Sequence, residues 1–321
     1  MHLPETQQTV RSHATTLTRD HHAPSGIRLW SRQLRIHQWL KNLLVFVPLL
    51  TAFVVTAAPS ALRAAAAFMA FCLAASATYV FNDLRDLAND RVHPRKRERP
   101  LASGAIQPKV AIAVAIALLA AAVIVGAGIG LPFLIALITY VVATIAYSWR
   151  VKQFVLLDVM LLSALYTIRI VGGAAAIDVQ LSVWLLTFSV FFFLSLALTK
   201  RCTELITIRQ RTLASHGRDY RAEDLSVVFP MAVAAGFCSV VVFIQFVSSP
   251  ETASKYASPE MLWVVGFALI AWLGRLWINT ARNQMHDDPL VYALRDTGSL
   301  VLIGVMIFFT LLARVLSVQP P

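Results

Sequence analysis

Long apolar segments divide this chain, and they constrain its fold more than any other feature. A helix needs about 20 apolar residues to cross the hydrocarbon core of a bilayer, and segments approaching that length recur from residue 43 to residue 316. Of the 321 residues, 58% are hydrophobic and 14% are charged, whereas a soluble domain usually carries about 25% charged residues. The sequence predicts an all-α membrane bundle of about nine transmembrane helices, near 43–58, 62–81, 110–129, 131–148, 154–176, 183–199, 226–247, 261–279 and 298–316.

The segment before the first apolar run is polar and differs from the rest of the chain. It lacks the apolar core of a signal peptide, and residues 1–27 are therefore expected to form a disordered cytoplasmic tail. Residues 28–42 mix aromatic, aliphatic and basic side chains, which is typical of an interfacial helix leading into the first span. Residues 28–321 are predicted to form a single transmembrane domain.

Basic residues fall on alternate connections between the predicted spans. They occupy the N-terminal tail and the loops after the second, fourth, sixth and eighth spans. Because cytoplasmic loops carry the excess of Lys and Arg, the N-terminus is predicted to be cytoplasmic and the C-terminus periplasmic. This pattern accounts for the net charge of +11, so no nucleic-acid partner is expected. Of the 28 Lys and Arg residues, the exceptions are Arg63, Arg169, Lys255, Arg275 and Arg314.

Three carboxylates end the second span at a helical spacing. Asp83, Asp86 and Asp90 fall at i, i+3 and i+7, so a continuing helix would place them on one face. Such a row of unpaired carboxylates is costly at membrane depth and points to a function. Mg²⁺ takes oxygen ligands, commonly one or two carboxylates together with substrate phosphates. The row therefore predicts a magnesium site that is also the catalytic centre.

Four cations follow within five positions, namely Arg95, Lys96, Arg97 and Arg99. Next to three carboxylates they suit a magnesium diphosphate, because the metal takes the carboxylates and the cations take the remaining phosphate oxygens. The positive charge of a cytoplasmic loop is a sufficient explanation for any single one of them. As a group, they indicate a diphosphate substrate.

Two opposite charges lie within the fifth span. They are costly in lipid, so Asp158 and Arg169 are expected to face a polar cavity or each other, and a purely structural ion pair stays open. Gly172 and Gly173, in the same span, are expected to permit close helix packing. The chain contains no Walker loop, GxGxxG or Ser/His/Asp arrangement, and its three cysteines lack metal or redox spacing.

The stretch Asn82-Asp83-x-x-Asp86-x-x-x-Asp90 resembles the first Asp-rich motif of the UbiA superfamily of membrane prenyltransferases. The resemblance extends over residues 28–316 and includes the nine predicted spans. It implies a UbiA-like bundle in which residues 28–321 form the catalytic domain, with Mg²⁺ as cofactor. Two further stretches agree with it, Arg97-x-Arg99-Pro-Leu-x-Ser-Gly104 and Tyr147-Ser148 to Lys152.

Within the superfamily, the closer resemblance is to the decaprenyl-phosphate phosphoribosyltransferase branch. It rests on Gln38-Trp39-Leu-Lys41-Asn42, Lys200-Arg201-x-x-Glu204-Leu205 and Ala293-Leu294-Arg295-Asp296. Members of that branch move a 5-phosphoribosyl group from phosphoribosyl diphosphate to a polyprenyl phosphate and release diphosphate, which feeds the synthesis of cell-envelope polysaccharides. The resemblance implies an enzyme of the bacterial inner membrane with its active site toward the cytoplasm.

Phosphoribosyl transfer to a polyprenyl phosphate would require particular partners and substrate contacts. The partners would be the lipid bilayer, a polyprenyl phosphate and a diphosphate donor, and a homo-oligomer is left open. A phosphoribosyl donor also carries a 5-phosphate, so a second anion site is expected. The residues expected to bind substrate are Gln38, Lys41, Asn42, Asn82, Arg95, Lys96, Arg99, Tyr147, Lys152, Asp158, Arg169, Lys200, Arg201, Glu204 and Arg295.

One departure from the family pattern bears on the donor. Aromatic prenyltransferases of the superfamily usually carry a second DxxxD motif after the sixth span, whereas this chain has Glu204, Asp219 and Glu223 there. The difference favours a phosphoribosyl donor. The alternative is transfer of a prenyl group from a prenyl diphosphate to an aromatic or other small acceptor. A transporter is disfavoured, because transporters more often show repeated halves with helices broken at the midplane.

Overall fold

The protein is represented by a computed structural model, which describes residues 26–94, 96–211, 219–285 and 288–316. None of these residues belongs to a strand. Eight helices of the described chain are long and apolar enough to cross a membrane. They match the second to ninth predicted spans and confirm the all-α membrane bundle: α3 (Ala58–Arg85), α5 (Pro108–Ile129), α6 (Leu131–Trp149), α7 (Leu157–Ala176), α8 (Val183–Arg211), α9 (Leu225–Val247), α11 (Leu262–Ala281) and α13 (Thr297–Val315).

The first predicted span, 43–58, differs from the prediction in its limits and its helix type. The chain forms α1 (Gly26–Gln33), the 3-10 helix η1 (Ile36–Phe46) and α2 (Val47–Thr51) before α3 begins. A 3-10 helix rises about 2.0 Å per residue and an α-helix about 1.5 Å, so η1 and α2 together extend roughly 30 Å, the thickness of a bilayer core. The elongated geometry lets a short segment make the first traverse.

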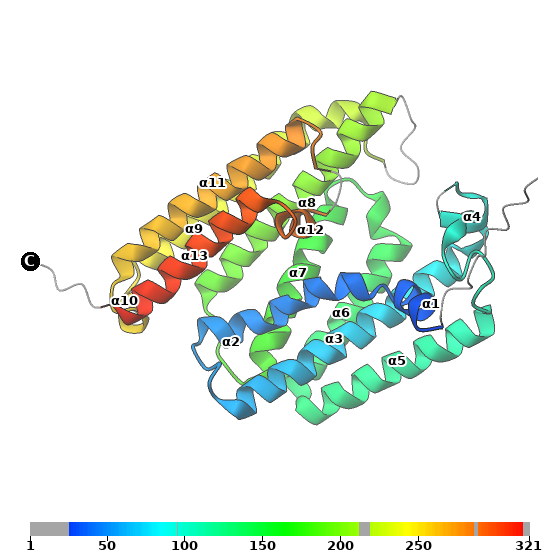
Figure 1. Cartoon of the computed structure of the whole chain (residues 1–321), viewed down its shortest axis with the longest axis horizontal. Helices are drawn as coiled ribbons and strands as arrows, with labels where there is room; N and C mark the ends of the chain where they lie inside the picture. The colour runs from blue at the N-terminus through cyan, green and yellow to red at the C-terminus, as the bar shows by residue number, and fades with distance from the viewer. Residues whose placement is uncertain (1–25, 95, 212–218, 286–287, 317–321) are drawn as a thin grey trace, which may run out of the picture.

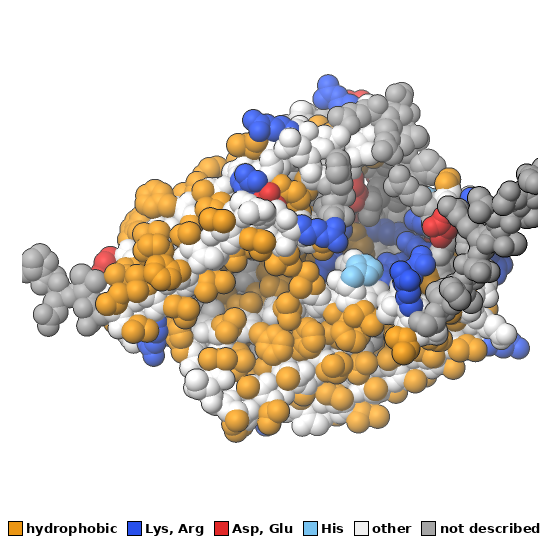
Figure 2. All heavy atoms as spheres, viewed as in Figure 1, with side chains coloured by type: hydrophobic (Ala, Val, Ile, Leu, Met, Phe, Trp, Pro, Cys, Tyr) orange, Lys and Arg blue, Asp and Glu red, His pale blue; other side chains and the backbone are white. Residues whose placement is uncertain are grey.

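Charged side chains gather at one end of the bundle, which we call the basic end. Helices α3, α6, α8 and α11 end there, and α5, α7, α9 and α13 begin there. Figure 2 shows Lys and Arg side chains around a hollow at this end. The short elements of the basic end are α4 (Leu87–Val92), η2 (Lys96–Glu98), η3 (Val151–Gln153), η4 (Ala222–Asp224) and α12 (Pro289–Ala293).

The opposite end holds the remaining short elements, α10 (Pro250–Lys255) and η5 (Pro259–Met261). Helix α1 lies at the basic end and the C-terminal end of α13 lies at the opposite end (Figure 1). An odd number of traverses requires this arrangement. The expected disordered tail, residues 1–27, lies outside the described residues except for its last two positions.

The outer surface between the two ends is apolar. Ile124 and Phe267 are 71% and 68% exposed, and many other large aliphatic side chains also face outward. A soluble protein rarely exposes an apolar surface of this extent, whereas lipid tails solvate such a surface. The protein is therefore integral to the membrane.

Helix α7 lies inside the bundle, and two glycines let its neighbours approach. A Cβ atom at Gly173 would lie 2.1 Å from the carbonyl oxygen of Val45 on η1. A Cβ atom at Gly172 would lie 2.7 Å from Cε2 of Phe71 on α3. No side chain fits at either position without displacing a neighbour, which confirms the expectation that these glycines permit close packing. They fix η1, with its polar residues, against α7.

Candidate active site

Two buried carboxylates at the basic end of α3 and α4 belong to a cluster that we call the carboxylate–guanidinium centre (Asp83, Asp90, Arg35 and Arg99). Asp83 Oδ1 accepts hydrogen bonds from Arg35 Nη2 at 2.6 Å and from Arg99 Nη1 at 3.1 Å. The same Arg99 nitrogen donates to Asp90 Oδ2 at 2.6 Å. Gln33 Nε2 donates to Asp83 Oδ2 at 3.0 Å. Charge-assisted contacts are the stronger class of hydrogen bond, so this is a fixed arrangement of charges.

Arg35 reaches the centre from the break between α1 and η1. Its backbone, with φ 52° and ψ 48°, lies in the left-handed region, which is uncommon for a residue with a Cβ atom. Its guanidinium carbon lies 4.8 Å from the centroid of the Tyr79 ring, in a cation–π contact. Gln33 and Arg35 thus attach the N-terminal segment to α3. Arg35 lies in residues 28–42, for which the sequence predicts an interfacial helix, and it was not among the predicted substrate contacts.

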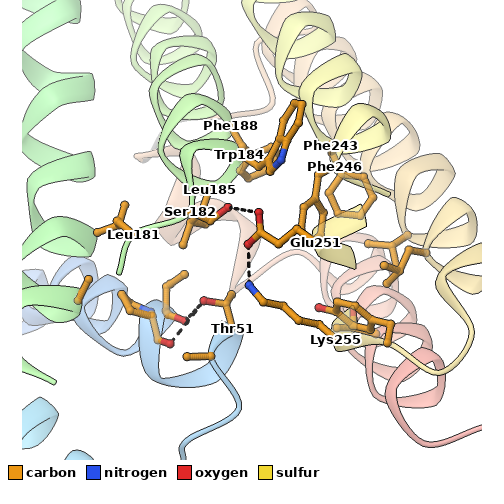
Figure 3. A pocket seen from close by; sticks show the side chains of 18 of the residues that line it. Thr51, Leu181, Ser182, Trp184, Leu185, Phe188, Phe243, Phe246, Glu251 and Lys255 are labelled. Atoms are coloured by element: carbon orange, nitrogen blue, oxygen red, sulfur yellow. Dashed lines mark hydrogen bonds and ion pairs between the residues drawn. The ribbon is translucent and has the colours of Figure 1, made fainter. Parts of the chain in front are cut away.

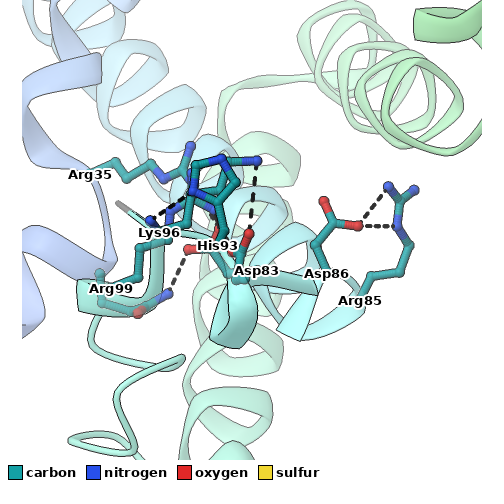
Figure 4. A network of polar contacts seen from close by, with 9 residues as sticks. Arg35, Asp83, Arg85, Asp86, His93, Lys96 and Arg99 are labelled. Atoms are coloured by element: carbon teal, nitrogen blue, oxygen red, sulfur yellow. Dashed lines mark hydrogen bonds and ion pairs between the residues drawn. The ribbon is translucent and has the colours of Figure 1, made fainter. Parts of the chain in front are cut away.

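Asp86 lies outside this centre, although it was predicted to share a helical face with Asp83 and Asp90. Helix α3 ends at Arg85, and Asp86 links it to α4 with φ −89° and ψ 6°. Its Oδ1 accepts hydrogen bonds from Nε and Nη2 of Arg85, both at 3.0 Å, and Figure 4 shows it turned toward that arginine. Within the described residues no three His, Cys, Asp or Glu side chains group closely enough to hold a metal ion. The three-carboxylate magnesium site stays a prediction.

The oxygens of this region nevertheless fit a magnesium ion. Carboxylate and amide oxygens are hard donors, and Mg²⁺ needs only one or two protein carboxylates when substrate phosphates complete its shell. Asp83 already accepts three hydrogen bonds, but the Asp86 side chain is 35% exposed. Gln33 Oε1 is buried without a hydrogen-bond partner. Asp86, Asp90 and Gln33 therefore keep oxygens that a cation can take.

A second cluster, the lysine–aspartate centre (Lys41, Lys200 and Asp288), lies where α12 begins. Asp288 Oδ2 is 2.9 Å from Lys41 Nζ and 3.3 Å from Lys200 Nζ. The Tyr166 hydroxyl donates to the same oxygen at 3.4 Å, and Asp288 Oδ1 caps α12 by accepting from Leu290 N at 3.2 Å. Burial raises the pKa of the Asp288 carboxyl, but the two lysines more than offset this and hold it below its usual range. The carboxyl is therefore ionised at neutral pH.

The two centres are linked through the first traverse. Arg35 precedes η1 and Lys41 lies on it, six positions later, which corresponds to roughly 12 Å at the rise of a 3-10 helix. Lys41 and Lys200 were predicted, whereas Asp288 and Tyr166 were not. The pair Asp288-Pro289 is a sequence signal for the start of α12, because an Asp followed by Pro is typical of a helix start.

Arg169 lies beside Lys41 in the interior of the bundle. Its Nε donates to Asn42 Oδ1 at 2.8 Å and its Nη2 donates to the Tyr140 hydroxyl at 3.2 Å. The Tyr166 ring is shared, since its centroid lies 5.7 Å from Lys41 Nζ and 5.6 Å from the Arg169 guanidinium carbon. Arg169 and Asn42, both predicted, are thus brought together. Asp158 and Arg169 were expected to face a polar cavity or each other, and the direct pairing of the two is not observed.

Asp158 instead pairs with Arg201. Arg201 contacts Asp158 Oδ2 through Nη2 and Glu204 Oε2 through Nη1, and the Tyr220 hydroxyl donates to Asp158 Oδ1 at 2.8 Å. Asp158 is fully buried and Arg201 is 2% exposed. The group fastens α7, α8 and the residues before η4 to one another, because a buried charge needs a partner. Asp158 and Arg201 are engaged with each other, and their contact with substrate stays a prediction.

The other predicted residues take several positions at the basic end. Lys96 Nζ lies 3.9 Å from Asp90 Oδ1 and its side chain is 46% exposed. Lys152 lies half-buried on η3, and Arg295 lies exposed after α12. Arg95 lies outside the described residues. Gln38 and Asn82 are half-buried and lie close along the chain to residues of the two centres, and Tyr147, also half-buried, lies near the end of α6.

An apolar cavity of about 350 Å³ lies toward the opposite end of the bundle (Figure 3). Its walls come from α2, α8, α9, α10, α11 and α13, and they include the aromatic side chains of Trp184, Phe188 and Phe246. A polar contact lies at its edge, where Glu251 Oε1 is 2.6 Å from Lys255 Nζ. A cavity with such walls suits an apolar chain.

Comparison with known proteins extends this picture. The nodulation protein NoeC of Azorhizobium caulinodans is 37% identical over 276 residues, which cover 84% of this chain and 88% of that protein. The uncharacterised protein y4nM of Sinorhizobium fredii is 38% identical over 277 residues, or 85% of this chain and 53% of that protein. The decaprenyl-phosphate phosphoribosyltransferase of Mycolicibacterium smegmatis is 35% identical over 178 residues, or 54% of this chain and 56% of that enzyme. The chain thus spans only about half the length of the last two relatives.

A solved structure and a family model complete the comparison. The structure of a UbiA homologue from Archaeoglobus fulgidus bound to GPP and Mg²⁺ has a TM-score of 0.66 at 16% identity, covering 88% of this chain and 99% of that chain. This likeness shows the fold. The model of the UbiA prenyltransferase family matches residues 44–297, which run from the last residues of η1 to the first residue of α13. The chain therefore belongs to the UbiA prenyltransferase family.

Proposed function

We propose that this protein transfers a 5-phosphoribosyl group from phosphoribosyl diphosphate to a polyprenyl phosphate. The observation that carries the proposal is the presence of two cation-bearing centres at one end of the bundle. Phosphoribosyl diphosphate has two anionic groups, a diphosphate on C1 and a phosphate on C5, and each needs its own cations. A prenyl diphosphate has one anionic group and an apolar tail. Two separate centres therefore suit the phosphoribosyl donor better.

The relatives give independent support. Four decaprenyl-phosphate phosphoribosyltransferases are 32–35% identical to this chain, over 54–64% of its length. Those alignments leave part of each enzyme unmatched, so the activity is proposed from the two centres and the relatives together.

The carboxylate–guanidinium centre would receive the diphosphate. Magnesium bound by Asp86 and Asp90 would supply charge neutralisation for the diphosphate, while Asp83 holds Arg35 and Arg99. Arg35, Arg99 and Lys96 provide donors for the remaining phosphate oxygens. An oxygen of the lipid phosphate forms the new bond to C1 of ribose as the bond from C1 to the diphosphate oxygen breaks, and the diphosphate leaves. The attacking phosphate is already an anion, so no strong general base is required.

The lysine–aspartate centre would receive the 5-phosphate. Lys41 and Lys200 come from η1 and α8, and both ammonium groups converge on one point. The apolar cavity offers part of the isoprene chain a place within the bundle, away from the charged centres. The basic end, by the distribution of Lys and Arg, would face the cytoplasm.

A competition between donors tests this assignment against prenyl transfer. Purified protein in lipid nanodiscs would receive phosphoribosyl diphosphate and a prenyl diphosphate at equal concentration, with Mg²⁺ and polyprenyl phosphate. We expect consumption of the phosphoribosyl donor and release of diphosphate. Consumption of the prenyl donor alone would reject the phosphoribosyl assignment in favour of a prenyltransferase.

A further inference from the structure

We infer that Asp288 is the positioning residue of the second anion site, holding the ammonium groups of Lys41 and Lys200 in place for a phosphomonoester. The inference rests on the proposed function, whose donor carries such a group. It adds to that function a residue on the connection between α11 and α13. No substrate contact was predicted for Asp288 from the sequence.

The carboxylate of Asp288 is held at both oxygens. Oδ1 accepts the backbone N–H of Leu290 and thereby caps α12, and Pro289 follows at the first helical position. Oδ2 accepts hydrogen bonds from both lysines and from the Tyr166 hydroxyl. Helix α12 packs against α8, the helix that carries Lys200. The carboxylate is therefore fixed relative to the backbone, and the lysine head groups are ordered by it.

The charges of the cluster match an anion site. Two ammonium groups that converge on one oxygen would repel each other without a carboxylate between them. With Asp288 in place the cluster keeps a positive excess of one charge. Each ammonium group has three N–H donors, and one on each suffices for Asp288. The remaining donors are available to the oxygens of a phosphomonoester.

The exposure of the three side chains gives the site a direction. Lys200 is 38% exposed, whereas Lys41 and Asp288 are 13% and 10% exposed. The carboxylate is thus much less exposed than Lys200, and an incoming anion meets the Lys200 ammonium group first. If the carboxylate instead occupied the position of the anion, its removal would tighten binding of the donor. The anchoring of Asp288 by α12 favours a positioning role over such competition.

The substitution Asp288→Asn removes the charge and keeps the cap, because Asn is as good an N-cap residue as Asp. The matched control is Asp296→Asn. Asp296 lies on the same connection, caps α13 through Ser299 N at 2.7 Å, and pairs with Arg275 at 2.8 and 2.7 Å. Both variants lose one ionised cap of the same loop. They differ in the partner that is left behind.

For Asp288→Asn we expect the KM for phosphoribosyl diphosphate to rise about tenfold, which corresponds to about 1.4 kcal/mol. The kcat and the KM for polyprenyl phosphate should change less than twofold, and inhibition by ribose 5-phosphate should weaken by about the same tenfold factor. Asp296→Asn should leave all four constants near the wild-type values. An unchanged or lower donor KM in Asp288→Asn, or an equal rise in both variants, would overturn the inference.

A mutant cycle keeps the test decisive if either variant folds poorly. Asp288→Asn should add little to the donor KM once Lys41→Gln and Lys200→Gln are both present, because it acts through those two lysines. Additive effects would contradict positioning. If the wild type consumes a prenyl diphosphate instead, the proposed function fails. The inhibition constants of ribose 5-phosphate for the wild type and Asp288→Asn, measured in that reaction, still decide the role of Asp288: a tenfold weakening sustains it and equal constants reject it.

Discussion

Arg99 lies between Asp83 and Asp90, and a single nitrogen, Nη1, donates to Asp83 Oδ1 at 3.1 Å and to Asp90 Oδ2 at 2.6 Å. One guanidinium thus joins the end of α3 to α4 across the helix break. Asp83 also accepts hydrogen bonds from Gln33 and Arg35. It therefore orders the cations of the site, whereas the more exposed Asp86 keeps oxygens for a metal ion.

This division of roles predicts different magnesium dependence for two variants. Asp83→Asn should lose about 10- to 100-fold in turnover, as for loss of residues that orient a metal site, and added Mg²⁺ should not restore it. Asp86→Asn should raise the Mg²⁺ concentration needed for half-maximal rate, because a ligand is lost. Magnesium titrations of initial rate distinguish the two. Recovery of Asp83→Asn at high Mg²⁺, with Asp86→Asn unaffected, would reverse the assignment.

Hydropathy and charge suffice to locate most of the membrane helices, because a span is defined by its length and apolar character. They do not report helix type, and so the first traverse was misplaced. Its 3-10 segment packs against α7, where Gly173 admits the backbone at Val45, and the left-handed Arg35 contacts Asp83 and Tyr79 on α3. Such close contacts between distant segments have no local sequence signal.

The buried pair of Asp158 and Arg201 predicts a loss of stability. Arg201→Met would leave Asp158 uncompensated in the interior, which costs about 3–5 kcal/mol when a buried pair is broken from one side. Thermal unfolding in detergent should show a clearly lower midpoint than for Arg275→Met, which breaks a surface pair. An unchanged thermal midpoint for Arg201→Met, together with a raised donor KM, would instead support a contact between this arginine and the substrate.

The same pair shows what a sequence can and cannot predict about a site. A charge inside an apolar span needs a partner, and this much was expected for Asp158. The choice of Arg201 over Arg169 follows from how α7 and α8 face each other, which no spacing along one helix reveals. Asp288 was missed for a related reason, since a loop carboxylate acquires its role only when η1 and α8 bring two lysines to it.

The contact between η1 and α7 predicts an effect of one methyl group. Gly173→Ala would place a Cβ atom against the carbonyl of Val45, and overpacking of this kind costs about 1–3 kcal/mol. Because η1 also carries Lys41, the donor KM should rise as η1 shifts. Gly128→Ala is the control, since its Cβ atom would meet open space on α5. Thermal midpoints and donor KM should change in the first variant and stay near wild type in the second.

The orientation is tested by labelling single cysteines in intact cells. In a background without Cys72, Cys202 and Cys238, a membrane-impermeant maleimide should label Ser254→Cys on α10. It should not label Glu98→Cys on η2 until the cells are opened. The expectation follows from the basic end facing the cytoplasm. If Glu98→Cys alone were labelled in intact cells, the basic end would face the outside and the predicted orientation would be wrong.

The central claim is that ribose 5-phosphate is transferred to a lipid phosphate, and the transfer can be followed directly. Purified protein in nanodiscs would be incubated with phosphoribosyl diphosphate labelled in the ribose, polyprenyl phosphate and Mg²⁺, and the lipids extracted into organic solvent. The account predicts label in the lipid fraction for the wild type, with equimolar diphosphate released, and strongly reduced label for Asp83→Asn. Label that stays entirely in the aqueous phase, while the same preparation consumes a prenyl diphosphate, would contradict it.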